Sequence, residues 1–155
     1  MEIITKEEII NIQAKWGEGI VDIGKKYLNN QDYESRAIDH INELYAYQIG
    51  EVLFKPTKVQ KNQFRSTFDE ALSYFVASNN VCEEDKGFAI QPWINVRFEN
   101  SNILLQGKTA IAMGNYYFTD TNSKDTKVEY TFGYIKSNNG KILINLHHSS
   151  IPYSE

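Results

Sequence analysis

KILINLHHSS, at residues 141–150, is predicted to form the last strand of a sheet, because branched apolar residues in its first half favour extended backbone. Side chains alternate between the two faces of a strand, so one face is predicted to hold Ile142, Ile144, Leu146, His148 and Ser150. This face is apolar first and polar last, as in a strand that crosses a core and ends at a pocket. His148 and Ser150 are therefore predicted to face the pocket, and His147 and Ser149 to face away.

A period of two in apolar residues precedes this strand from residue 88 onward. Turn-forming residues separate the segments, and Asn139-Gly140 is the strongest hairpin signal in the chain. The sequence predicts earlier strands at Phe88–Ile90, Trp93–Phe98, Ile103–Leu105, Thr109–Phe118 and Lys127–Tyr134.

The first half of the chain shows helical periodicity instead. Thr5 and Glu8 form a capping box at the start of the first helix, whose glycines are expected to let another element pack closely. A second helix is predicted from Tyr33 to Gly50, and a third from about Gln60 to Val76. The apolar stripe of the third helix consists of Phe64, Phe68, Leu72 and Phe75. Between these two helices, the proline in Lys55-Pro56-Thr57 predicts a fixed corner after a short apolar run.

Helices followed by a run of antiparallel strands predict an α+β fold, with the helices on one face of a twisted sheet. The 155 residues suit one domain over residues 1–155, with no linker or repeat. The formal net charge of −4 and the scattered basic residues disfavour nucleic acid and anionic membranes as partners. No leader or membrane segment is visible, which predicts a cytoplasmic protein, or a periplasmic one if a signal peptide was removed.

The histidines do not suggest a metal site. His147 and His148 are neighbours on a strand and point to opposite faces, while His40 lies on a distant helix. The single cysteine, Cys82, excludes a cysteine-rich zinc site and an internal disulfide. We therefore expect no metal and no cofactor, and a pocket of hydroxyls and one imidazole that suits a small polar or anionic ligand.

Three segments together resemble the iota-class carbonic anhydrases: Phe54–Thr57, Ala71–Phe75 and His147–Pro152. This resemblance implies a nuclear transport factor 2-like (cystatin-like) fold, in which a cone-shaped, curved antiparallel sheet wraps around the N-terminal helices. It also implies a metal-free site that holds bicarbonate. The implied hydroxyl ligands are Thr57, Tyr74 and Ser150, with His148 as the neighbouring imidazole. The alternative pair is His147 with Ser149, which the alternation argument ranks second.

The implied reaction is the reversible hydration of carbon dioxide, with hydroxyl donors stabilising the growing negative charge and His148 as the expected proton acceptor. The competing hypothesis is a non-catalytic association or small-acid-binding module, like the association domain of calcium/calmodulin-dependent kinase II. None of the three arginines, Arg36, Arg65 and Arg97, lies in the last strand, which favours the enzyme. Either function leaves an apolar outer sheet face, including Ile111, Met113, Tyr117 and Ile135, which predicts a homodimer.

Overall fold

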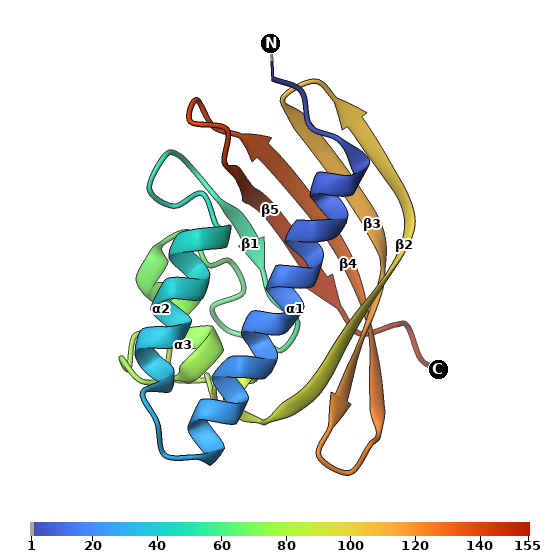
Figure 1. Cartoon of the computed structure of the whole chain (residues 1–155). Coiled ribbons are helices and arrows are strands. Elements are labelled where there is room, and N and C mark those ends of the chain that lie inside the picture. Colours follow the sequence, from blue (N-terminus) through green and yellow to red (C-terminus); the bar gives the residue numbers. More distant parts are fainter. Residues whose placement is uncertain (1) are drawn as a thin grey trace.

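The computed structural model describes residues 2–155 as a curved sheet that curls around the first helix (Figure 1). Its helices are α1 (Lys6–Leu28), α2 (Tyr33–Leu44), α3 (Phe68–Val76) and the short 3-10 helix η1 (Phe88–Ile90). Its strands are β1 (Leu53–Lys55), β2 (Trp93–Gln106), β3 (Thr109–Asp120), β4 (Asp125–Lys136) and β5 (Ile142–Ser150). The strand order is β1-β5-β4-β3-β2, and all pairs are antiparallel except β1 with β5. The predicted α+β fold is confirmed.

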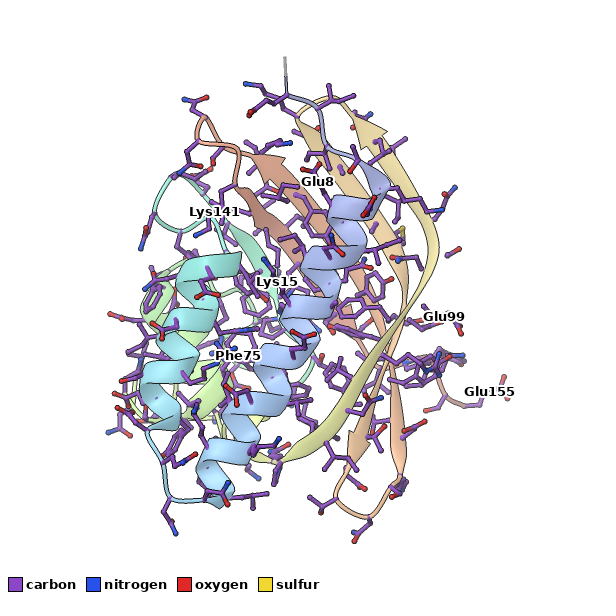
Figure 2. The ribbon with its side chains drawn as sticks, viewed as in Figure 1. Glu8, Lys15, Phe75, Glu99, Lys141 and Glu155 are labelled. Carbon is purple, nitrogen blue, oxygen red and sulfur yellow. The ribbon has the colours of Figure 1, made fainter. Side chains whose placement is uncertain are left out.

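Helix α1 lies against the inner face of the sheet, and side chains fill the space between them (Figure 2). The predicted capping box is present, since Thr5 accepts a hydrogen bond from the Glu8 amide while the Glu8 carboxylate accepts one from the Thr5 amide. Gly19 is required on this helix, because a Cβ there would lie 2.1 Å from Nδ1 of His40 on α2. The prediction that small residues let another element approach α1 is therefore confirmed.

Several predicted boundaries are wrong. Helix α2 ends at Leu44 rather than Gly50, and α3 begins at Phe68 rather than Gln60. Phe64 is consequently 71% exposed instead of lying on a buried stripe. A second capping box explains the later start of α3, because Thr67 and Glu70 exchange hydrogen bonds between side chain and backbone.

Two further segments differ from the predicted strands. Phe88–Ile90 is a turn of 3-10 helix, not a strand. The predicted break near Asn100-Ser101-Asn102 is a β-bulge inside one continuous strand, β2, where Ser101 has no partner on β3. The sheet thus bends at this point without ending a strand.

A second bulge, in β5, decides which side chains face the core. Ile144 pairs with Tyr134 and Leu146 pairs with Gly133, so Asn145 is an extra residue without a partner on β4. One extra residue reverses the alternation of side chains beyond it. His147 and Ser149 therefore face into the cone, with exposures of 2% and 1%, while His148 and Ser150 face outward. The prediction that His148 and Ser150 face the pocket is wrong, because strict alternation was assumed across residue 145.

No helix within residues 2–155 combines the length and apolar character needed to cross a membrane.

Candidate functional site

The His147 imidazole lies at the centre of the aromatic core. Strand pairing places it between Phe54 on β1 and Phe132 on β4. The ring centroids are 4.7 Å from Phe54 and 3.9 Å from Phe132, and both pairs are stacked. Stacking on both faces leaves only the ring edge, with its two nitrogens, free to form hydrogen bonds.

The inner half of a hydrogen-bond chain begins at α1 and reaches this imidazole. The Trp16 indole Nε1 donates to the Tyr45 hydroxyl over 3.0 Å. The same hydroxyl lies 2.8 Å from His147 Nδ1. Trp16 and Tyr45 are 2% and 1% exposed, so water does not compete for these bonds.

The outer half continues from the imidazole to the loop that follows β1. His147 Nε2 lies 3.0 Å from the Tyr116 hydroxyl, and the Tyr116 hydroxyl lies 2.6 Å from Ser149 Oγ. Ser149 Oγ is in turn 2.6 Å from Thr57 Oγ1. The chain of hydrogen bonds therefore ends at Thr57, which is only partly buried.

The indole at the start fixes the direction of this chain. An indole only donates, so the Tyr45 oxygen accepts, and its own hydrogen is free for His147 Nδ1. Among residues 2–155, no other acceptor lies within hydrogen-bonding distance of the Tyr45 hydroxyl. A neutral imidazole that accepts at Nδ1 carries its hydrogen on Nε2, and it therefore donates to Tyr116.

The outer hydrogen bonds, from Tyr116 to Thr57, run in the same direction. Tyr116 accepts from His147, so its hydrogen points to Ser149 Oγ, and the Ser149 hydrogen points to Thr57 Oγ1. The opposite direction would leave the Tyr45 hydrogen buried without an acceptor, which is costly. The Thr57 hydrogen is consequently the one left for a ligand.

Burial keeps every group in this chain uncharged near neutral pH. It lowers the pKa of His147 well below 6.5, and the nearby His148 and His40 lower this pKa further. Burial also raises the pKa of the Tyr45 and Tyr116 hydroxyls above their ordinary value of 10. The hydroxyls therefore remain protonated and able to donate.

Tyr74, on α3, borders the outer end of the chain. Its hydroxyl accepts a hydrogen bond of 3.2 Å from the Lys58 amide, one residue beyond Thr57. Burial raises the pKa of this hydroxyl above 10, so it too stays protonated. The structure thus places Tyr74 beside the Thr57 corner.

A rigid loop holds the Thr57 corner in place. The Glu84 carboxylate accepts hydrogen bonds from the amides of residues 60, 61 and 62 at 2.7, 3.0 and 2.6 Å. Arg65 then pairs with Asp85 through two hydrogen bonds of 2.6 and 2.8 Å, with side-chain exposures of 0% and 1%. Helix α3 anchors the same ion pair, because Arg65 Nη1 also donates to the Glu70 carbonyl over 3.0 Å and the Ser73 hydroxyl donates to Asp85.

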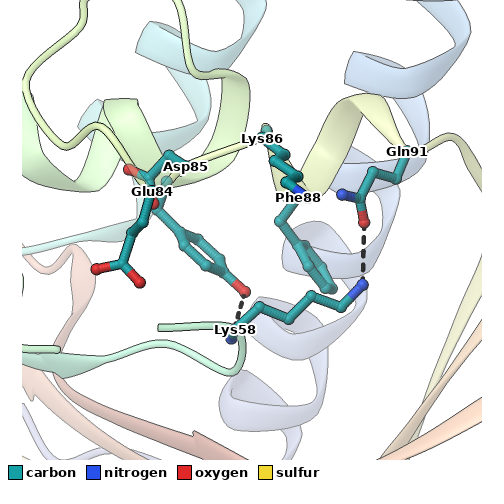
Figure 3. Close-up of a pocket in the computed structure, with 8 residues that line it drawn as sticks. Lys58, Glu84, Asp85, Lys86, Phe88 and Gln91 are labelled. Carbon is teal, nitrogen blue, oxygen red and sulfur yellow. Dashed lines mark hydrogen bonds between the residues drawn. The ribbon is translucent and has the colours of Figure 1, made fainter. Parts of the chain in front are cut away.

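A cavity of about 330 Å³ opens beside Tyr74 (Figure 3). The Tyr74 ring stacks on Phe88, with centroids 5.6 Å apart, and both rings form its wall. Its remaining lining residues are Lys58, Glu84, Asp85, Lys86, Gly87 and Gln91. We call the hydroxyls of Thr57, Ser149, Tyr116 and Tyr74 the hydroxyl cluster. Tyr74 therefore connects the cavity to this cluster.

His148 and Ser150, which face outward, lie in a different environment from His147 and Ser149. Ser150 Oγ donates to the Glu129 carboxylate over 2.8 Å, and His148 is exposed on the outer face opposite Thr131. Neither side chain can reach Thr57 from that face. Of the residues predicted from the sequence, the structure brings together Thr57, Tyr74, His147 and Ser149, and it separates His148 and Ser150 from them.

The sequence did not identify Tyr116, Tyr45 or Trp16 as parts of the site. A tyrosine that alternates with apolar residues on an inward face must find a partner for its hydroxyl, and this was the available signal. Within the described residues, no group of three or more His, Cys, Asp or Glu side chains is arranged to hold a metal ion. The donors of the site are hydroxyls, which suit the oxygens of a small anion.

Comparison with known proteins gives consistent results. The family model described as metal-independent carbonic anhydrase matches residues 7–151. A metal-independent carbonic anhydrase of Nostoc sp. strain PCC 7120 is 40% identical over 155 residues, covering 98% of this chain and 76% of the relative.

Solved structures show the same relationship. The crystal structure of a cyanobacterial iota-carbonic anhydrase complexed with bicarbonate has a TM-score of 0.95 at 40% identity, covering 99% of this chain and 95% of that one. A candidate calcium/calmodulin-dependent kinase II association domain from Xanthomonas campestris has a TM-score of 0.63 at 23% identity, covering 100% and 97% of the two chains, which shows a shared fold. The chain belongs to the metal-independent, or iota-class, carbonic anhydrases.

Proposed function

We propose that this protein catalyses the reversible hydration of carbon dioxide at the hydroxyl cluster of Thr57, Ser149, Tyr116 and Tyr74. The observation that supports the proposal is the directed hydrogen-bond chain, which presents donors where an anion can accept them. The bicarbonate-bound relative, at 40% identity, adds support for this ligand. The pairing of His147 with Ser149 replaces the pairing of His148 with Ser150 in this account.

The reaction forms one C–O bond. The oxygen of a water molecule attacks the carbon of carbon dioxide, one C=O π pair moves onto oxygen, and the water loses a proton to a second water. The products are bicarbonate and a hydrated proton. Donors already aligned with the oxygen that becomes negative stabilise this charge in the transition state, at little reorganisation cost.

Thr57 donates to the developing anion in this scheme, and Ser149 supports Thr57 by donating to its oxygen. Tyr74, which accepts from the Lys58 amide, keeps its own hydrogen for a bicarbonate oxygen. His147 orients Tyr116 and is not the proton acceptor, because its pKa lies well below neutral. The proton therefore leaves through water in the cavity beside Tyr74.

A pH-indicator stopped-flow assay of carbon dioxide hydration tests the proposal. The wild-type protein, treated with a chelator and freed of metal, should accelerate hydration well above the buffer rate. A rate equal to buffer would refute the enzyme and favour the association module. Loss of activity on chelation, restored by zinc, would refute the hydroxyl-only mechanism.

The positions of the three arginines support the alternative, a carboxylate-binding module, less than they support the enzyme. Arg65 is held by Asp85, Arg36 pairs with Asp22, and Arg97 lies over the Tyr117 ring. None of these guanidinium groups bonds to the hydroxyl cluster in the described residues. A carboxylate ligand would therefore lack the two-pronged arginine contact that such ligands favour.

We also propose a homodimer through the outer face of the sheet. Met113, Ile111 and Leu104 are 57%, 37% and 54% exposed there, and pairing places Ile111 opposite Leu104. A second copy related by a twofold axis would cover these side chains. Sedimentation should show a dimer at micromolar concentration and a monomer for Met113→Glu, whereas a monomeric wild type would contradict the proposal.

A further inference from the structure

The cavity beside Tyr74 has an unbalanced set of charges. Its two carboxylates are already occupied, since Glu84 accepts from three loop amides and Asp85 pairs with Arg65. Its two ammonium groups belong to Lys58 and Lys86, and neither forms a salt bridge with another described residue. The uncompensated charge facing the cavity is therefore positive.

Lys58 is held in an extended position across the cavity (Figure 3). Its Nζ donates to the neutral Gln91 Oε1 over 3.0 Å. It also lies 5.9 Å from the Phe88 ring centroid and 5.8 Å from that of Trp93. Partial burial and the charge of Lys86 lower the pKa of Lys58. No carboxylate among the described residues forms a salt bridge with its ammonium group.

The backbone of the same lysine touches the catalytic cluster. The Lys58 amide donates to the Tyr74 hydroxyl, while its side chain reaches Gln91 on the other side of the cavity. Lys58 thus contacts both the Tyr74 hydroxyl, which is proposed to donate a hydrogen bond to bicarbonate, and the opening to solvent. An anion in the cavity would meet the ammonium first and the Tyr74 hydroxyl next.

We propose that this cavity is a second anion-binding site, where the Lys58 ammonium, backed by Lys86 and Gln91, holds bicarbonate between solvent and the hydroxyl cluster. The proposal rests on the function proposed above and adds a capture step to it. When an anion arrives, one of its oxygens replaces Gln91 Oε1 as the acceptor of the hydrogen bond from Lys58 Nζ. No covalent bond changes in this step. The volume of about 330 Å³ holds a bicarbonate ion together with several water molecules.

This site explains how a charged product can leave an aromatic core. Carbon dioxide is neutral and partitions into apolar surroundings, whereas bicarbonate must remain solvated or paired. A basic site with low-dielectric walls raises the local concentration of anions, and this effect weakens with salt. Lys58 and its aromatic floor of Phe88 and Trp93 meet both conditions.

The test uses the side-chain amide of Gln91 as a reporter. The ¹⁵N-labelled protein is titrated with sodium bicarbonate, and separately with sodium thiocyanate, at constant ionic strength. The Gln91 amide signal should shift and saturate in the wild type. Lys58→Met should weaken the bicarbonate affinity measured at Gln91 by about three- to fivefold, and Lys58→Arg should keep it within about twofold.

Lys61→Met is the matched control. Lys61 is exposed, lies three residues after Lys58 in the sequence, and does not line the cavity. It should bind as the wild type does. The kcat/KM values of Lys58→Met should fall by one common factor in the hydration and dehydration directions, because the reaction equilibrium fixes their ratio. This decrease should shrink as salt is added.

An unmoved Gln91 signal in the wild type, or equal affinities for Lys58→Met and Lys61→Met, would overturn the second site. These outcomes differ from a failure of the proposed function. A protein whose Gln91 signal saturates with bicarbonate but which does not hydrate carbon dioxide would keep the anion site and lose the enzyme.

Discussion

The hydroxyl oxygen of Tyr116 lies 2.6 Å from Ser149 Oγ inside the cone, and it lies 3.0 Å from Nε2 of His147. Tyr116→Phe cuts the chain at this point and keeps the ring. The variant loses both hydrogen bonds of this hydroxyl, and leaving a buried partner unsatisfied costs about 1–3 kcal/mol, so kcat/KM should fall about 5- to 150-fold. Tyr134→Phe is the control, because Tyr134 is equally buried but, among residues 2–155, its hydroxyl hydrogen-bonds only with Gln13, at 3.4 Å. Equal losses for the two variants would contradict a specific role for Tyr116.

Tyr45 is predicted to set the tautomer of His147 from the far side of the ring. Nitrogen-15 NMR of the wild type should show the hydrogen of His147 on Nε2 and an accepting Nδ1. Tyr45→Phe removes the donor at Nδ1, so the imidazole should populate both tautomers and kcat should fall with little change in KM. A wild-type imidazole with its hydrogen on Nδ1 would refute the direction derived from Trp16.

The two buried histidines should make folding stability depend on pH in a defined window. Burial lowers the pKa of His40 to about 3 and that of His147 well below 6.5. Below pH 6.5 the unfolded chain binds more protons than the folded protein does. The stability that comes from keeping these histidines neutral is therefore fully present above pH 6.5 and is lost as the pH falls. From pH 6.5 to 5 the free energy of unfolding should fall by about 2 kcal/mol through His40, and His147 should add a loss of the same sign.

Urea denaturation at the two pH values measures this loss. Carboxylates with lowered pKa values, such as Glu8 and Glu84, lose their contribution only below about pH 4.5, outside this window. Equal stability at pH 6.5 and pH 5 would show that the imidazoles are not buried as described.

Asp85→Asn tests the loop that holds Thr57. The change leaves the Arg65 charge buried with its partner neutralised, and breaking a buried pair costs about 3–5 kcal/mol. The free energy of unfolding should fall by that amount, and kcat/KM should fall as the corner loosens. Arg97→Gln, at an exposed pair, should change stability by less than about 1 kcal/mol. A loss for Asp85→Asn no larger than that would refute a structural role for the pair.

Much of the fold could be predicted because its signals are local. The capping box at Thr5 and Glu8 marked the start of α1, and Asn139-Gly140 marked the β4–β5 hairpin. The start of α3 was missed although Thr67 and Glu70 show the same signal as Thr5 and Glu8. A stripe that included Phe64 outweighed this local cue.

The site was harder to predict because it depends on pairing between strands. A bulge at Asn145 has no signal in β5 itself, since it appears only when Ile144 and Leu146 pair with adjacent residues of β4. Hydrogen bonds that join α1, Tyr45 after the end of α2, β3 and β5 are equally non-local. The resemblance left two pairs open, His147 with Ser149 and His148 with Ser150, and strict alternation ranked first the pair that the structure turns outward.

The most direct test of the central claim compares Ser149→Ala with Ser150→Ala in the stopped-flow assay of carbon dioxide hydration. The account predicts a loss of kcat/KM of about 100-fold for Ser149→Ala, which breaks the donor chain to Thr57, and a change within about twofold for Ser150→Ala. Full activity in Ser149→Ala, with the loss in Ser150→Ala instead, would contradict it.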